Sequence, residues 1–278
     1  MAVALITGSS SGIGQLSALE LARRGHRVFA SMRNLENAHY ILAKAEKGQL
    51  SLETLQLDVT EAASVTAAIA HVTERAGRLD VLVNNAGFGA FGPIEDYSDE
   101  DLREVFETNF FGAIRVTRAA LPAMRANRSG TIVMVSSISG LRTFPFLSVY
   151  SASKFALEAA SNGLRHELRP FGIRVVVVEP GNFNTRAGLN IYYPKRLAGT
   201  FAQNTIDPLY ARLWERYRTA GGNLSFGDAN DVAQVISDAA EAKNPPPRYI
   251  VGKDAEEIAA LSPEDFERTM IKRMSVSS

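Results

Sequence analysis

A tyrosine, a lysine and a serine have the spacing of a proton-transfer site. Tyr150 and Lys154 stand four residues apart in VYSASKFALEAAS, and Ser137 lies 13 residues before Tyr150 in VMVSSISG, at the end of an apolar run. On a helix, positions i and i+4 share one face, so the phenol and the ammonium can address the same cleft. Because a nearby ammonium stabilises phenolate, we expect Lys154 to bring the pKa of Tyr150 toward the working range and make it a general acid or base.

Each of these residues also has an ordinary structural explanation. A tyrosine is often a half-buried amphipathic side chain, a lysine usually coats a solvated helix face, and Ser136, Ser137 and Ser139 are typical hydroxyls of a strand end. A tyrosine and a lysine at this spacing are a weak signal on their own. The prediction of catalysis therefore depends on the elements around them.

Short β-branched, apolar runs alternate with longer amphipathic stretches along the chain. The predicted strands are residues 3–7, 27–32, 50–57, 81–84, 131–136 and 173–178, with a weaker strand at 249–251. Runs such as RVVVVEP and LDVLVNN are almost continuously apolar, which is typical of a parallel sheet covered on both faces. The pattern predicts a three-layer α/β/α fold with a doubly wound parallel sheet, in which ligands bind beyond the carboxyl ends of the strands.

The first predicted strand leads directly into a glycine-rich turn, ALITGSSSGIG, and then into a helix. Gly8 permits a tight turn, Gly12 lets the backbone approach a pyrophosphate, and Gly14 lets the helix pack near the sheet. Free amides at the helix start attract negative charge. The turn therefore predicts a dinucleotide site, although its spacing differs from the usual GxGxxG.

Composition excludes several classes of function. The 278 residues contain 30 Lys and Arg and 30 Asp and Glu, so no basic field would attract nucleic acid or anionic lipid. There are no cysteines, and the four histidines have no ligand spacing, so we expect no disulfide and no metal. With neither a signal peptide nor a membrane span in the sequence, we expect a cytoplasmic protein.

The default is one domain over residues 1–278. Regular alternation fails between residue 182 and about residue 227, where aromatic residues stand among Gly, Pro and basic residues. This stretch is too long for an ordinary connection. We interpret residues 186–227 as a partly helical substrate-binding insertion or lid within that domain.

Six features in order resemble the short-chain dehydrogenases/reductases. They are TGSSSGIG at 7–14, NNAG at 84–87, Asn109, Ser137, YSASK at 150–154 and EPGNFNT at 179–185. The resemblance covers about residues 2–185 and fades beyond them. It implies a Rossmann fold and an oxidoreductase that interconverts a carbonyl and a secondary alcohol with a nicotinamide cofactor. The long C-terminal part looks closer to hydroxysteroid and retinol dehydrogenase-like members, an analogy that does not fix a substrate.

The resemblance also implies a role for each matching residue. Tyr150 would be the proton donor or acceptor, Lys154 would lower its pKa and bind the nicotinamide ribose, Ser137 would polarise the carbonyl, and Asn109 would hold a water linking Lys154 to solvent. Asp58 and Val59 would meet adenine, and Pro180, Gly181 and Thr185 would seat the nicotinamide. Together with the residues named for their own chemistry, the predicted cofactor-binding residues are Gly8, Ser10, Ser11, Gly12, Ile13, Gly14, Arg33, Asp58, Val59, Asn85, Ala86, Gly87, Tyr150, Lys154, Pro180, Gly181 and Thr185.

The end of the second predicted strand, FASMRN, bears on the form of the cofactor. Met32 occupies the position where an acidic residue would accept hydrogen bonds from the adenosine ribose, and Arg33 follows it. A guanidinium suits a 2′-phosphate, which favours NADP(H), with NAD(H) as the alternative. Met32→Asp should shift the preference toward NAD. Arg33 could equally be a solvated charge at the start of a helix.

The expected substrate is a bulky apolar ketone or secondary alcohol. By resemblance, Phe88, Phe91 and residues 141–147 would surround the reacting carbon, although these aromatics could simply pack the lid. An NADP(H)-binding sensor without turnover and an epimerase or dehydratase on nucleotide-linked sugars are the competing hypotheses. Family resemblance implies a homodimer or homotetramer, and the small residues of the helix that carries Tyr150 would allow close packing there.

Overall fold

Seven parallel strands form the central sheet in the order β3-β2-β1-β4-β6-β7-β9. The structure, a computed structural model, describes residues 1–183, 191–197, 205–220 and 226–275. The strands are β1 (Val3–Ile6), β2 (Arg27–Met32), β3 (Leu52–Gln56), β4 (Val81–Asn84), β6 (Gly130–Val135), β7 (Ile173–Pro180) and β9 (Arg248–Val251). All seven predicted strands form. β7 extends beyond its predicted end, because Glu179 and Pro180 pair with Ile250 and Val251.

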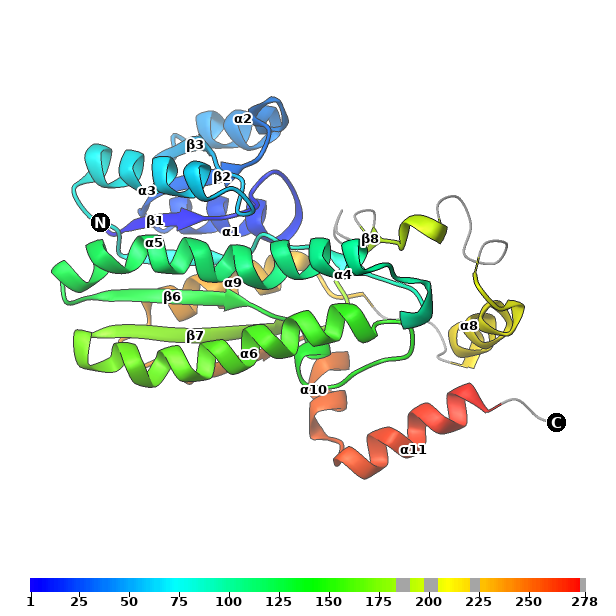
Figure 1. The fold of residues 1–278 in the computed structure, drawn as a ribbon. Helices are drawn as coiled ribbons and strands as arrows, with labels where there is room; N and C mark the ends of the chain where they lie inside the picture. The colour runs from blue at the N-terminus through cyan, green and yellow to red at the C-terminus, as the bar shows by residue number, and fades with distance from the viewer. Residues whose placement is uncertain (184–190, 198–204, 221–225, 276–278) are drawn as a thin grey trace.

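Helices cover both faces of this sheet (Figure 1). On one face lie α3 (Ala62–Ala76), α5 (Ala113–Ala126) and α6 (Ser148–Leu168), and on the other lie α1 (Gly12–Arg23), α2 (His39–Lys47) and α9 (Ala229–Glu241). Side chains alternate across a strand, so Leu5 packs in the first layer and Ala4 and Ile6 in the second. The predicted three-layer, doubly wound α/β fold is confirmed.

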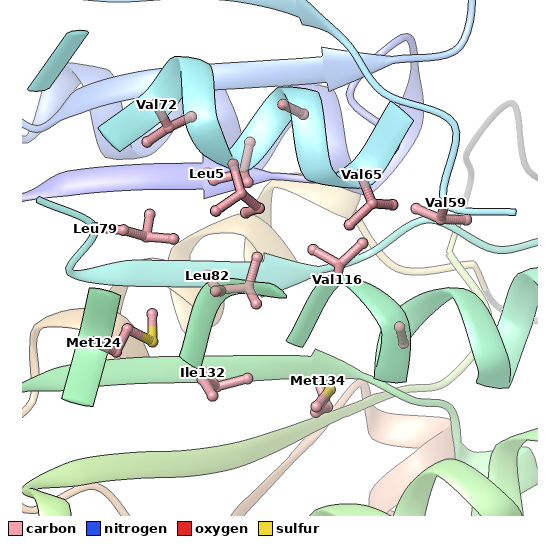
Figure 2. Packing of buried hydrophobic residues seen from close by; sticks show 14 of the residues in the cluster. Leu5, Val59, Val65, Val72, Leu79, Leu82, Val116, Met124, Ile132 and Met134 are labelled. Carbon is pink, nitrogen blue, oxygen red and sulfur yellow. The ribbon is translucent and has the colours of Figure 1, made fainter. Parts of the chain in front are cut away.

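The first layer shows how the apolar runs hold the helices in place. Figure 2 shows Leu5 and Leu82 of the strands near Val65 of α3 and Val116 of α5, in the same buried cluster as Ile132. Four of these five side chains are fully buried and Val65 is 1% exposed. Burial of such a side chain contributes about 1.5–3 kcal/mol. The strands and helices that carry the candidate site are therefore anchored in a continuous core.

A long interrupted helix lies between β4 and β6. α4 (Asp99–Phe106) begins with a capping box in which Ser98 and Asp101 exchange side-chain and backbone hydrogen bonds. It continues into a π-helical segment, η3 (Glu107–Gly112), and then into α5. Such π segments frequently occur at functional sites. Asn109 lies within this one.

The remaining elements lie outside the central sheet. They are η1 (Leu35–Ala38), β5 (Gly89–Ala90), η2 (Ile94–Asp96), η4 (Ile138–Gly140), η5 (Arg169–Phe171), β8 (Ile191–Tyr192), η7 (Lys195–Leu197), α8 (Pro208–Ala220), α10 (Lys253–Ala260) and α11 (Pro263–Met274). The predicted insertion at 186–227 falls partly outside the described residues. Its described parts include β8, which pairs with β5, and the helix α8.

The C-terminal helices brace the loop at 141–147. Arg142 donates a 2.8 Å hydrogen bond to the carbonyl of Leu261, and Phe144 packs edge-on against Phe266 of α11 at 5.4 Å between ring centroids. These contacts hold the loop that connects η4 to α6.

None of the described helices is both long enough and apolar enough to cross a membrane.

Candidate active site

The glycine-rich turn between β1 and α1 is closely packed against the segment that follows β4. Gly8 has a φ of +70°, and a Cβ added there would lie 2.8 Å from the Cα of Ala86. A Cβ on Gly14 would clash with Nδ2 of Asn85, which donates hydrogen bonds to the carbonyls of Thr7 and Gly8 at 2.9 and 3.1 Å. Side chains larger than glycine do not fit, so the backbone can stay close to a ligand.

Amide groups of this turn remain at the start of α1, where the helix dipole favours an anion. α1 begins at Gly12, and Ser11, its N-cap residue, makes no side-chain cap hydrogen bond. Ser10 and Ser11 are partly exposed, as are Gly12 and Ile13. This arrangement fits the pyrophosphate of a dinucleotide, as the glycine spacing predicts.

The end of β2 lies beside the glycine-rich turn. The Ser9 amide donates a 2.8 Å hydrogen bond to the carbonyl of Ser31, which brings the two segments together. Arg33 is exposed there, so its guanidinium is accessible to a ligand. The side chain of Met32 instead lies in the core, 2% exposed, in the same cluster as Ala38 and Ile41. An acidic residue at position 32 would therefore enter an apolar environment.

Ser137, Tyr150 and Lys154 converge at the carboxyl end of β6. Ser137 follows the strand, and its Oγ accepts a 3.1 Å hydrogen bond from the amide of Ser139. Tyr150 lies in the first turn of α6, and the Ser137 hydroxyl is close enough to influence its phenol. Lys154, 5% exposed, donates a 2.9 Å hydrogen bond from Nζ to the carbonyl of Val135. The structure brings together the three residues that the sequence singles out.

Burial is the largest influence on the pKa values of Tyr150 and Lys154. It raises the pKa of Tyr150, and the nearby Ser137 hydroxyl opposes that rise. Burial also lowers the pKa of Lys154 to about 8, and the negative charge of Glu158 opposes that shift. The Lys154 Nζ is 5.8 Å from the centre of the Tyr150 ring. The pKa of Tyr150 is therefore raised and not brought toward the working range as the tyrosine–lysine spacing predicts, because burial of a phenolate is costly.

Asn109 is fixed by backbone contacts rather than exposed for solvent. Its Nδ2 donates to the carbonyl of Phe88 at 2.9 Å and to the Ser153 hydroxyl at 3.2 Å, and its Oδ1 accepts from the Phe88 amide at 3.0 Å. A Cβ on Gly87 would lie 3.0 Å from the Asn109 Oδ1 and 3.7 Å from the Lys154 Nζ. Asn109, Gly87 and Lys154 thus lie next to one another.

Other predicted cofactor residues lie along the same edge. Asp58 and Val59 follow β3, and the Asp58 carboxylate accepts hydrogen bonds from the amide and hydroxyl of Thr60 at 3.0 and 2.8 Å. Val59 is 5% exposed, and a Cβ on Gly112 would meet it at 2.6 Å. Asn85, Ala86 and Gly87 follow β4 directly. Thr185 lies outside the described residues.

Asp254 lies at the edge of the candidate site and was not predicted from the sequence. Its Oδ2 accepts hydrogen bonds from the backbone amide and the side-chain Nδ2 of Asn182, at 2.8 and 2.9 Å. A Cβ on Gly181 would clash with its carboxylate. Asp254 therefore holds the turn of Pro180, Gly181 and Asn182. The available signal was a carboxylate just after the last predicted strand, at the ligand-binding edge.

Aromatic side chains form a wall beside Tyr150. Phe88 and Tyr192 stack at 5.6 Å between ring centroids and pack, with Tyr150, against one apolar cluster. Farther along, Phe91 lies 4.4 Å from Trp214 of α8, measured between ring centroids. Phe91 is 8% exposed, so it contributes to the packing of α8. The aromatics named from the sequence therefore divide between a wall near the phenol and the packing of outer helices.

Among the described residues, no group of three or more His, Cys, Asp or Glu side chains is arranged to hold a metal ion. The charged groups of the site include Lys154, Arg33 and Asp254, and its neutral donors are hydroxyls and amides. Such a set suits proton transfer and the binding of a nucleotide.

Comparison with known proteins gives a consistent assignment. The short chain dehydrogenase family model matches residues 2–192. Mouse 17-beta-hydroxysteroid dehydrogenase type 1 is 37% identical over 273 residues, covering 95% of this chain and 77% of that protein. A 3-ketodihydrosphingosine reductase of Bacteroides thetaiotaomicron is 40% identical over 183 residues, covering 66% of this chain. The match spans only 64% of the length of that reductase.

Solved structures agree with the sequence matches. A short-chain dehydrogenase from Streptomyces avermitilis aligns with a TM-score of 0.81 and 34% identity, covering 98% of this chain and 95% of that one. A single-residue variant of actinorhodin polyketide ketoreductase, solved with NADPH, aligns with a TM-score of 0.74 and 29% identity, covering 90% of this chain and 95% of that one. The fold, the order of the motifs and these matches agree: the chain belongs to the short-chain dehydrogenase/reductase family, oxidoreductases that act on CH–OH groups with a nicotinamide cofactor.

Proposed function

We propose that this protein is an NADP(H)-dependent oxidoreductase that interconverts a bulky apolar ketone and its secondary alcohol, with Tyr150 as proton donor and acceptor. The observation that carries the proposal is the convergence of Ser137, Tyr150 and the buried Lys154 ammonium at the carboxyl end of β6. A bound nicotinamide nucleotide supplies or takes up the hydride.

The chain's own residues supply the proton and orient the carbonyl. As negative charge grows on the substrate oxygen, the hydroxyl of Ser137 stabilises it and the phenol of Tyr150 transfers its proton to it. Burial raises the pKa of Tyr150, so the phenol keeps its proton at neutral pH and is ready for reduction. Donors placed where charge develops each contribute about 10²–10³-fold to the rate.

The preference for NADP(H) rests on Arg33 and its neighbours. Arg33 is exposed at the end of β2, next to the turn that carries Ser10 and Ser11. A guanidinium and two hydroxyls suit a 2′-phosphate, and an acidic residue that would repel it is missing from the FASMRN segment. The related ketoreductase was solved with NADPH.

The substrate class follows from the wall beside the phenol. Phe88 and Tyr192 present aromatic rings to the region around Tyr150. Burial of apolar substrate surface against them would be favourable, at about 25 cal/mol for each Å². The name of the mouse relative, a 17-beta-hydroxysteroid dehydrogenase, describes an enzyme of a bulky apolar alcohol.

Oxidation of NADPH with a panel of steroid, aromatic and aliphatic ketones tests the proposal. We expect turnover with bulky apolar ketones, a much weaker rate with NADH, and loss of turnover in Tyr150→Phe. Tight NADPH binding with no turnover on any member of the panel would favour the sensor hypothesis. Fast turnover by Tyr150→Phe would refute the role of the tyrosine.

A further inference from the structure

Two buried carboxyl groups lie behind Lys154. Glu158 follows Lys154 by one turn of α6 and is 5% exposed, and Glu179, near the end of β7, is fully buried. A carboxylate removed from water is costly unless a charge or a proton compensates it. Two of them together therefore need an explanation beyond ordinary packing.

Arg248 of β9 contacts both carboxyls. Its guanidinium is 2.7 Å from Oε1 of Glu179 and 3.5 Å from Oε2 of Glu158. Arg165 adds positive charge nearby, but its hydrogen bonds go to other groups. One of them, 3.0 Å long, is donated by Nε to the Val175 carbonyl. One direct guanidinium therefore serves two carboxyls. Like charges this close favour retention of one proton by the pair.

Glu158 lies against η4, the turn that follows Ser137. A Cβ on Gly140 of η4 would be 2.7 Å from the Ser136 Oγ and 3.3 Å from Oε1 of Glu158. Lys154 and Glu158 are four residues apart on α6, so their side chains share one face of the helix. Glu158 is thus the carboxyl nearer to Lys154 along the helix, and Glu179 is the one nearer to Arg248.

We propose, on the basis of the function proposed above, that Glu158 and Glu179 share one proton and one negative charge, and that the charge on Glu158 keeps Lys154 protonated during the reaction. Glu158 is then a positioning residue, because it acts through Lys154. Glu179 is the member that holds the proton, and its contact with Arg248 anchors the pair.

The protonation of the two sites agrees with this arrangement. Burial and the neighbouring charge of Glu158 raise the pKa of Glu179 to about 8. Burial lowers the pKa of Lys154 to about 8, and Glu158 is the group that opposes this. Two carboxylates on the elements α4 and η3, which also pack against α6, have other partners: Asp101 accepts from the Tyr192 hydroxyl, and Glu107 pairs with Arg115.

Two nearly isosteric variants test the proposal in opposite directions. In Glu158→Gln the negative charge moves to Glu179, farther from Lys154, so the pKa of Lys154 should fall by roughly half to one unit. In Glu179→Gln the amide imitates the protonated acid and the charge stays on Glu158, so the pKa of Lys154 should stay level or rise. The titration is followed by NMR of the Lys154 ammonium, which does not require turnover, and thermal unfolding checks both folds.

The pH profile of ketone reduction supplies a second measurement. Its alkaline limb should move to lower pH in Glu158→Gln and should not do so in Glu179→Gln. Equal shifts in both variants, or no shift in Glu158→Gln, would overturn the proposal. If Glu158→Gln does not fold, Glu158→Asp takes its place. The shorter side chain moves the carboxylate back toward the helix backbone, so the Lys154 pKa should fall by a smaller amount. An inactive wild type with the expected Lys154 titrations would refute the enzyme function but support the carboxyl pair.

Discussion

Lys154 donates a 2.9 Å hydrogen bond from its ammonium to the carbonyl of Val135, at the carboxyl end of β6. The ammonium is therefore held at the catalytic edge although its side chain is only 5% exposed. The cost of that burial appears in its pKa, which falls from 10.5 to about 8. The site thus contains a charge that folding disfavours and that the proposed reaction needs.

Replacement of this lysine should separate stability from activity. At pH 7, Lys154→Met should be more stable than the wild type by about 1–3 kcal/mol, after allowance for the lost hydrogen bond to Val135, and should lose ketone reduction. The unfolded chain binds more protons between pH 8 and 10.5, so wild-type stability rises with pH across this window and the advantage of the variant shrinks. Urea unfolding at several pH values measures this; a variant less stable at pH 7 would contradict it.

Loss of the phenol hydroxyl should affect chemistry and leave the nucleotide site intact. We expect Tyr150→Phe to lower kcat by about 10²–10⁴-fold while the Kd of NADPH changes little. Tyr97→Phe is a matched control, because the buried Tyr97 hydroxyl has no hydrogen-bond partner among the described residues. Steady-state kinetics and NADPH fluorescence give the two readouts. Similar losses in both variants would indicate that the effect on Tyr150 is structural.

Removal of the exposed arginine after β2 should discriminate between the two nucleotides. Arg33→Ala should raise the KM for NADPH by about 10–100-fold and leave the KM for NADH nearly unchanged. Arg33→Lys should retain part of the preference, since an ammonium keeps the charge but loses the bidentate geometry. Kinetics with both cofactors measure the ratio, and equal changes for NADPH and NADH would rule out a 2′-phosphate contact.

The hydrogen bonds between Asp254 and Asn182 predict an effect on cofactor binding. Asp254→Ala removes the acceptor of two hydrogen bonds and releases the turn at Pro180 and Gly181. We expect the KM for NADPH to rise by about tenfold with a smaller change in kcat. Lys253→Ala, at the neighbouring and exposed position, is the control. An unchanged KM in Asp254→Ala would show that this turn does not seat the nucleotide.

Much of the site was predictable because a parallel sheet gathers its strand ends at one edge. The proximity of Ser137, Tyr150 and Lys154 could therefore be predicted from their order in the sequence. Asp254 did not, since its partner Asn182 is 72 residues away and no local pattern links them. The position of Met32 was equally hidden, because a strand covered on both faces has no polar alternation to show where each side chain points.

Protonation was the other feature that sequence could not supply. The pair spacing indicated that Lys154 would act on Tyr150, but the burial that shifts both pKa values arises from elements far along the chain. Glu158 was visible one helical turn after Lys154, whereas its contact with Arg248 requires β9 to pair with β7. Charge balance in a core depends on packing that motifs do not encode.

The position of β9 at the edge of the sheet has a consequence for synthesis. This strand is the last of the seven to leave the ribosome, and it brings Arg248 and, shortly after it, Asp254 to the site. The first six strands can align before it arrives, yet the carboxyl pair would then lack its cation and the turn at Gly181 its anchor. A chain that lacks β9 would thus have most of its sheet but neither Arg248 nor Asp254 at the site.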